Sequence, residues 1–353
     1  MKVLFSLVVV LVLALLAYVG TGLAPGQIFF GVVMPYLAFA VFLVGLVAKI
    51  VRWARAPVPF RIPSTCGQQK SLDWIEPAKY DNPHNVFGVI VRMALEVLAF
   101  RSLFRNIKSE VKDGRIIHGP NKWLWLAALA FHYSFLVIFI RHLRFFTEPV
   151  PFFVHWAESL DGFFQVGVPF LFITDVVIVL AVTYLFLRRV VVPQLRYISL
   201  PADYFPLFLI LGIAISGILL RYFVKTDIVA VKSLALSLVG VGERGDPSQI
   251  HWLFYSHLFL VCSLLIYFPF SKLMHMGGVF LSPTRNLVNN NRAVRHINPW
   301  NPDIKPHSYE AYEDEFRERM VECGLPVDKP LQQAAPAGEA PAAEPAAPPA
   351  EEE

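Results

Sequence analysis

Residues 122–146 read KWLWLAALAFHYSFLVIFIRHLRFF, and residues 251–275 read HWLFYSHLFLVCSLLIYFPFSKLMH. Each stretch exceeds the roughly 20 residues that an α-helix needs to cross the hydrocarbon core of a bilayer. Each also carries histidines inside an otherwise apolar run. Ionisable side chains at membrane depth are costly, so they usually mark a site with a partner. The two stretches therefore predict membrane helices that hold a functional site.

The composition of the whole chain supports a membrane protein. Of the 353 residues, 56% are hydrophobic and only 16% are charged, whereas a soluble chain carries roughly 25% charged residues. The mean hydropathy is +0.52. We therefore expect an all-α integral membrane fold, a six-helix transmembrane bundle. Its spans are expected at residues 3–21, 27–51, 122–146, 163–187, 204–224 and 251–275.

The chain is expected to divide into four parts. Residues 1–26 form an N-terminal anchor, because an apolar run of about 17 residues is long for the 7–15 of a cleavable signal peptide. Residues 27–280 form the bundle, and residues 281–329 form a polar C-terminal segment. Residues 330–353 are rich in Ala, Pro and Glu and lack aromatic residues, which predicts a disordered tail.

Lysine and arginine residues predict the orientation of the bundle. They concentrate in the insert at 52–121, in the loop after 187 and in the C-terminal segment. Cytoplasmic loops carry such an excess, so we expect both termini in the cytoplasm and the chain in the inner membrane. Within the insert, residues 86–110 predict an amphipathic helix at the cytoplasmic face. This helix either covers the end of the bundle or docks a partner, and both interpretations fit.

The three cysteines limit the cofactors of this chain. Cys66, Cys262 and Cys323 lie far apart, and no CxxCH motif is present. We therefore expect neither a covalently attached c-type haem nor an iron–sulfur cluster held by this chain alone.

The four histidines within the spans predict metal ligands. A single buried histidine is as well explained by packing, but two on each of two helices are not. Imidazole suits iron, and histidines from two helices can hold a haem from both sides. Because the two helices run antiparallel, His132 should pair with His275 near the cytoplasm, and His142 with His257 near the outside. Two haem b groups, stacked roughly 20 Å apart, follow from the helical rise.

These residues resemble a known family. The spacing of the histidine pairs is similar to that in the gamma subunits of respiratory nitrate reductase, which are dihaem b-type membrane anchors that oxidise quinol. The stretch PVPFRIPSTCGQQKSLDWIEPAKYDNP at 57–83 looks closer still to one branch, the membrane cytochrome b subunits of the Dsr sulfite-reduction complex. The resemblance covers about residues 27–280.

The resemblance implies an electron-transfer subunit of a quinone-linked oxidoreductase. It would relay electrons between menaquinone at the outer haem and a cytoplasmic iron–sulfur partner, a subunit resembling heterodisulfide reductase. Other membrane and extracytoplasmic subunits, together with lipid, complete the expected partners, and no nucleic acid is expected. Alternatives are the anchor of another respiratory reductase such as nitrate reductase, or a proton transporter with a histidine relay. An anchor that only recruits a complex would not need four such histidines.

Further side chains near the outer face are candidates for the same chemistry. Arg141 and Arg144 flank His142 and either bind the haem propionates or extend to the outer headgroups. Asp175 lies deeper and either serves a proton path or bonds a histidine ligand. An ordinary interfacial helix start also explains the carboxylates nearby. The quinone-site candidates are His155, Glu158, Asp161 and Gln165.

Overall fold

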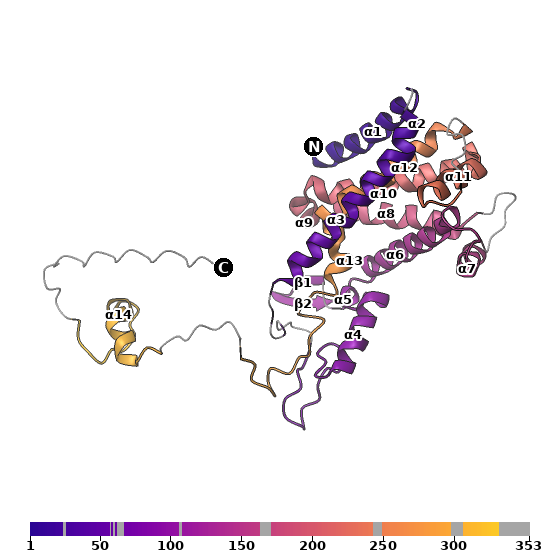
Figure 1. Cartoon of the computed structure of the whole chain (residues 1–353). Coiled ribbons are helices and arrows are strands. Elements are labelled where there is room, and N and C mark those ends of the chain that lie inside the picture. Colours follow the sequence, from indigo (N-terminus) through magenta and orange to yellow (C-terminus); the bar gives the residue numbers. More distant parts are fainter. Residues whose placement is uncertain are drawn as a thin grey trace, which may run out of the picture. The chain divides into compact units, whose positions relative to one another are not determined.

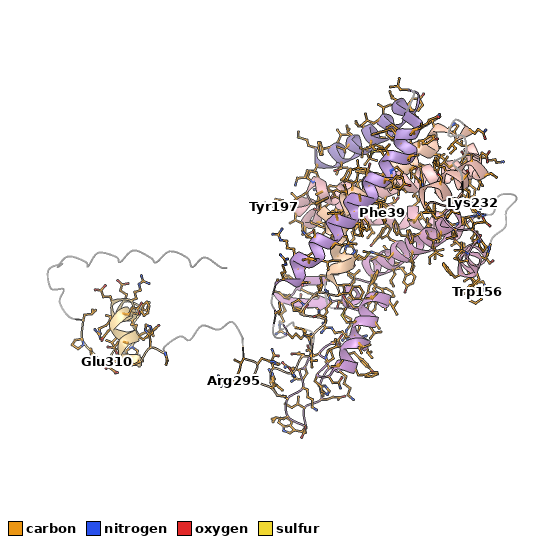
Figure 2. All side chains as sticks on the ribbon, viewed as in Figure 1. Phe39, Trp156, Tyr197, Lys232, Arg295 and Glu310 are labelled. Atoms are coloured by element: carbon orange, nitrogen blue, oxygen red, sulfur yellow. The ribbon has the colours of Figure 1, made fainter. Side chains whose placement is uncertain are left out.

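The computed structural model describes residues 1–23, 26–56, 58, 61, 67–105, 108–162, 171–242, 249–297 and 306–331. The chain divides into two compact units, Met1–His296 and Ile297–Glu353. The first unit is mostly helical, and among the described residues its sheet consists of the antiparallel pair β1 (Lys108–Lys112) and β2 (Arg115–Gly119). Figure 1 shows the helices of this unit packed as a bundle, with α4 and the strands at one end.

Five helical stretches are long and apolar enough to cross a membrane, among the residues that the structure describes. The first two are α1 (Lys2–Thr21) and Gly26–Ala54, which consists of α2 (Gly26–Ile28), η1 (Phe29–Val33) and α3 (Met34–Ala54). The third is Lys122–Phe145, with α6 (Lys122–His142) and η2 (Leu143–Phe145). The last two are Pro201–Val224, with α10 (Pro201–Ile218) and η3 (Leu219–Val224), and Trp252–Phe270, with α12 (Trp252–Tyr267) and η5 (Phe268–Phe270). The chain is therefore a multi-pass membrane protein of the expected all-α class, and the expected count of six spans is not exact for the described residues.

The sixth expected span corresponds to helix α8 (Ile173–Val191), which is more polar than the others. It carries Asp175 in its first turn and Arg188 and Arg189 in its last turn. The first eight residues of the expected span at 163–187 lie outside the described residues. Helix α8 nevertheless belongs to the bundle, because it packs between α6 and α10.

Helix α12 lies at the centre of the bundle and contributes side chains to two hydrophobic clusters. It packs against α1, α3 and α10, while α10 also packs against α1 and α8. Tyr255 is fully buried in the cluster formed with α3 and α11 (Ile228–Leu238), and Leu260 is buried against Leu209 and Val182. Apolar side chains on several faces of α12 are therefore covered by protein, as expected of a central helix.

The helix expected at 251–275 does not continue to its end. Helix α12 stops at Tyr267, and the chain then forms the short turns η5 (Phe268–Phe270), η6 (Lys272–Met274) and α13 (His275–Gly278). Pro269 causes the break, because proline lacks the N–H and its ring clashes with the preceding turn. Gly45 of α3 permits close packing there, since a Cβ would lie 2.7 Å from the Pro269 ring. His257 and His275 consequently do not share one straight helix.

The insert also differs from its predicted form. The single helix expected at 86–110 is instead α4 (Val86–Ala99) and α5 (Arg101–Phe104), separated by Phe100, and its last residues begin β1. A hairpin follows, because Asp113 and Gly114 both adopt positive φ, as a tight turn between twisted strands requires. We name this end of the bundle the insert end.

The opposite end carries the helix α7 (Phe152–Asp161), and we name it the α7 end. Helix α6 joins the two ends, because it starts after β2 and packs against α7. A short helix, α9 (Pro193–Ile198), links α8 to α10.

The second unit contains helix α14 (Tyr309–Glu322), and its centre is the buried Glu313. The Glu313 carboxylate accepts hydrogen bonds from the backbone N–H groups of Asp328 and Lys329 and pairs with Arg317.

Candidate functional site

The structure brings the four membrane histidines together as two pairs. The ring centres of His132 and His275 lie 5.9 Å apart, and their planes are inclined by 82°. The ring centres of His142 and His257 lie 6.4 Å apart, and their planes are inclined by only 16°. We call the first the insert-side pair and the second the α7-side pair.

The two pairs are joined by a continuous helix on one side and by a broken helix on the other. His132 and His142 lie on the continuous helix α6, and ten residues of α-helix rise about 15 Å. The segment from His257 to His275 is not one straight helix, because the turns around Pro269 interrupt it. The separation of roughly 20 Å expected from the sequence averaged this segment with α6, and it stays a prediction.

Each histidine has its Nδ1 atom occupied by a neighbouring oxygen. The Nδ1 atoms of His132, His142 and His275 lie 2.7, 2.7 and 2.8 Å from the carbonyl oxygens of Ala128, Ile138 and Lys272. A carbonyl oxygen only accepts, so these Nδ1 atoms carry the proton. The Nε2 atom of each ring is then left with a free lone pair, which is the form that binds a metal.

His257 reaches the same state through a serine side chain. Its Nδ1 atom lies 2.9 Å from Ser216 Oγ, whose own hydroxyl lies 2.7 Å from the carbonyl oxygen of Gly212. Because the hydroxyl donates to that carbonyl, its oxygen accepts from His257. The neighbouring Gly217 provides the room, since a Cβ there would lie 3.2 Å from Cε1 of His257.

The spacing of the rings fits a haem iron between them. A metal–imidazole bond is about 2 Å long, and a ring centre lies about 1.1 Å from its nitrogens, so opposite ligands on one iron have ring centres about 6 Å apart. The observed 5.9 and 6.4 Å match this value. Both donor sets are imidazole nitrogens, which suit iron.

Arg141 belongs to a buried ion network beside the α7-side pair. One terminal nitrogen lies 2.9 Å from Asp175 Oδ1 and the other lies 3.2 Å from Asp161 Oδ2. Its guanidinium also lies 3.7 Å from the centre of the Phe172 ring. Arg141 is buried, so it does not extend to the headgroups. The two carboxylates therefore explain why a buried positive charge is stable at the α7 end.

The two carboxylates of the network have further partners. Asp161 accepts hydrogen bonds from the backbone N–H and the hydroxyl of Thr174, at the start of α8. Asp175 accepts a hydrogen bond from the Tyr222 hydroxyl at 2.8 Å. The network therefore ties α6, α7, α8 and η3 (Leu219–Val224) together at this end.

The remaining candidates lie on or next to α7. Arg144 pairs with Glu158 at 2.7 Å, and His155 is largely exposed with its Nδ1 atom 4.0 Å from Glu158. Gln165 lies outside the described residues, as does Cys66. The polar candidates that the structure describes thus lie at the α7 end, on α7, on the end of α6 and the turn that follows it, and, for Asp175, on α8.

The sequence of this chain is similar to known membrane proteins. The profile of the family described as nitrate reductase gamma subunit matches residues 89–296, which is more than half of the chain. The chain belongs to this family. A relative from Archaeoglobus fulgidus is 45% identical over 285 residues, covering 79% of this chain and 85% of its own. A relative from Archaeoglobus profundus is 45% identical over 281 residues, covering 76% and 82%. Both are described as Hdr-like menaquinol oxidoreductase cytochrome b-like subunits.

The gamma-subunit match contains both histidine pairs and the network around Arg141, and it begins within α4. Helices α1 and α3 precede the matched residues, although both pack against α12. The resemblance found in the sequence is therefore correct at the level of the family.

Several residues that contact the candidate site of this gamma-subunit member were missed by sequence reasoning. Ser216 and Tyr222 gave no signal, because each acts through a residue more than 40 positions away in the sequence. Phe100 is a further case: its ring centre lies 4.9 Å from that of His132.

Proposed function

We propose that this chain is a dihaem b cytochrome that relays electrons between menaquinol at the α7 end and an iron–sulfur protein at the insert end. The observation that carries the proposal is the pair of bis-histidine sites at two depths along α6, each with its Nδ1 atoms bonded and its ring spacing suited to iron. The names of the two Archaeoglobus relatives support menaquinol and a heterodisulfide-reductase-like assembly.

The residues of the chain would hold two haems in fixed positions. His132 with His275 would hold one haem and His142 with His257 the other through imidazole nitrogens, and the hydrogen bonds at Nδ1 would fix each ring. Haem iron accepts and donates one electron at a time. Two such sites about 15 Å apart along α6 would divide the passage across the bilayer into short steps.

The α7 end has the groups that quinol oxidation needs. Oxidation of a quinol releases two protons together with two electrons, so acceptors are required near the haem. The side chains of His155 and Glu158 are 62% and 20% exposed, although Glu158 pairs with Arg144, whereas Asp161 is only 2% exposed and is held by Arg141 and Thr174. We therefore favour Glu158 and His155 as the proton acceptors among the described candidates, and place the α7 end outside and the insert end in the cytoplasm.

The sulfite-reduction role is the finer part of the proposal. It rests on the resemblance of residues 57–83 to the Dsr branch. It implies a cytoplasmic heterodisulfide-reductase-like subunit, with other membrane and extracytoplasmic subunits in the same complex. The family description also supports a second candidate function, the quinol-oxidising anchor of a nitrate reductase. Purification of the native complex and identification of its catalytic subunit distinguishes the two.

A haem count tests the central claim. The purified chain should show two b haems in a pyridine haemochrome assay, reducible by a menaquinol analogue. His142→Ala or His257→Ala should each leave about one haem, and the remaining haem should be the insert-side one. His155→Ala is the matched control, since this side chain is largely exposed, and it should retain both haems. A chain without haem, or a loss of the insert-side haem in His142→Ala, would refute the assignment.

A further inference from the structure

Helix α4 presents its apolar side chains to the surroundings and its charges to the protein. Val86, Ile90, Ala94 and Leu98 recur every four residues, so they lie on one face of the helix, with Phe87 beside them. All five are exposed, and Ile90 and Leu98 are 61% and 62% exposed. We name these five residues the α4 stripe. An exposed stripe of this kind marks an interaction surface.

The opposite face of α4 is buried and charged. Arg92 is only 6% exposed, and Glu96 pairs with Arg285 at 3.2 Å while accepting hydrogen bonds from Ser102. An amphipathic helix that merely covered the bundle would turn its apolar face inward. The inverted orientation of α4 indicates that a second body covers the stripe.

The C-terminal end of the stripe lies at the insert-side histidine pair. The carbonyl oxygens of Leu98 and Ala99 accept hydrogen bonds from Tyr133 and Trp125 of α6. Phe100 follows in a left-handed conformation with φ 49°, and its ring meets the edge or face of the His132 ring at an angle of 85°. This backbone conformation is energetically unfavourable for a bulky residue. This left-handed turn, which we call the elbow, places Phe100 between His132 and the end of the stripe.

The N-terminal end of α4 lies away from the bundle. A helix of 14 residues is about 21 Å long. Just before it, the carbonyl oxygen of Pro83 accepts a hydrogen bond from the backbone of Asn289, and the Asn289 side chain bonds to Asn82. In Figure 1 this end of α4 points away from the bundle, beyond the ends of α3 and α6.

The direction and charge of α4 favour a protein over a lipid surface as the occupant. A helix that lies in a membrane interface keeps its length at one depth and carries lysine and arginine on its polar face. Helix α4 instead extends from the bundle end outward, and its polar face is covered by protein. A protein that covers the stripe also comes within reach of Phe100 and His132.

We propose that the α4 stripe is the docking surface for the redox protein that exchanges electrons with the insert-side pair. The proposal rests on the proposed function, because it takes the His132–His275 site as the exit haem. The occupant is a protein that carries an iron–sulfur cluster and presents an apolar groove to α4. Docking there places its cluster near the elbow at Phe100, so that binding and electron exchange occur at one place.

Substitution within the stripe tests the proposal on the whole complex purified from membranes. Ile90→Asp should reduce the amount of iron–sulfur subunit that co-purifies with the chain at least tenfold, and Leu98→Asp should do the same. Both variants should keep two b haems per chain and normal haem reduction by quinol, because neither side chain is buried. Val111→Asp is the matched control: Val111 is an exposed aliphatic residue on β1, outside the stripe, and the variant should retain the subunit.

A photo-crosslinking amino acid at position 90 identifies the occupant. It should capture a peptide of a subunit that carries iron–sulfur clusters. Capture of lipid alone, retention of the partner by Ile90→Asp, or equal loss in the Val111→Asp control would each overturn the docking proposal. These outcomes are separate from failure of the proposed function, which would show as absence of haem from the unsubstituted chain.

Discussion

Replacement of Arg141 by methionine should destabilise the bundle strongly. The substitution removes the positive charge between Asp161 and Asp175, whose side chains are only 2% and 12% exposed. Breaking a buried ion pair from one side costs about 3–5 kcal/mol, because a buried charge is left without its partner. The value should lie near the lower limit, since Thr174 and Tyr222 still donate to the two carboxylates.

This free energy translates into a measurable shift of the unfolding temperature. For a body of this size, 1 kcal/mol corresponds to about 2–4 °C, so Arg141→Met should lower the midpoint by about 5–15 °C. Scanning fluorimetry of the detergent-purified chain provides the measurement. Arg144→Met is the matched control: the Arg144 side chain is 43% exposed and pairs with Glu158, and exposed pairs contribute about 0–1 kcal/mol.

A double variant separates charge from packing. Asp175→Asn added to Arg141→Met should recover part of the lost stability, because the unpaired buried charge is removed. If Arg141→Met unfolds no more readily than Arg144→Met, the ion network is not the role of Arg141. If stability is unchanged but the α7-side haem is lost, Arg141 serves the haem propionates instead.

Three further predictions concern other parts of the chain. Pro269→Ala should let α12 continue past Tyr267 and displace His275. The haemochrome count should then fall by the insert-side haem only, and two retained haems would contradict this. Gly114→Ala should weaken the hairpin by about 1 kcal/mol, because φ is +73°, and unchanged proteolysis at 108–119 would argue otherwise. In α14, hydrogen bonds from the backbone of Asp328 and Lys329 and the pairing with Arg317 hold the pKa of Glu313 below its usual range. Amide protection factors of residues 309–331 should therefore be full above the ordinary glutamate pKa and fall as the pH drops through the lowered value, and Glu313→Gln should flatten this dependence.

The sequence predicts well what depends on hydrophobic length and helix direction. Apolar stretches located the five spanning helices, and the antiparallel order of α6 and α12 predicted which histidine rings lie together. Both inferences need only the period of a helix and the thickness of a bilayer.

The parts that sequence reasoning missed depend on contacts between distant residues. Periodicity showed that α4 has an apolar face, but not that this face points outward, because Arg92 and Glu96 find partners in the rest of the fold. The network of Arg141 likewise depends on Asp161 and Asp175, which come from two other helices. The end of α12 at Tyr267 was also missed, because hydrophobic length alone does not show that Pro269 interrupts the apolar run.

The position of the two histidine pairs along the chain imposes an order on biosynthesis. His132 and His142 are made more than a hundred residues before His257 and His275. At a synthesis rate of about 5–20 residues per second, His257 and His275 follow the first two histidines by on the order of 10 s. Under the proposed function, neither His132 nor His142 can complete its histidine pair during that interval. Haem bound across both pairs would close two nested loops of the chain, 132–275 and 142–257. It would stabilise the packing of α12 beside α6 only after translation has passed His275.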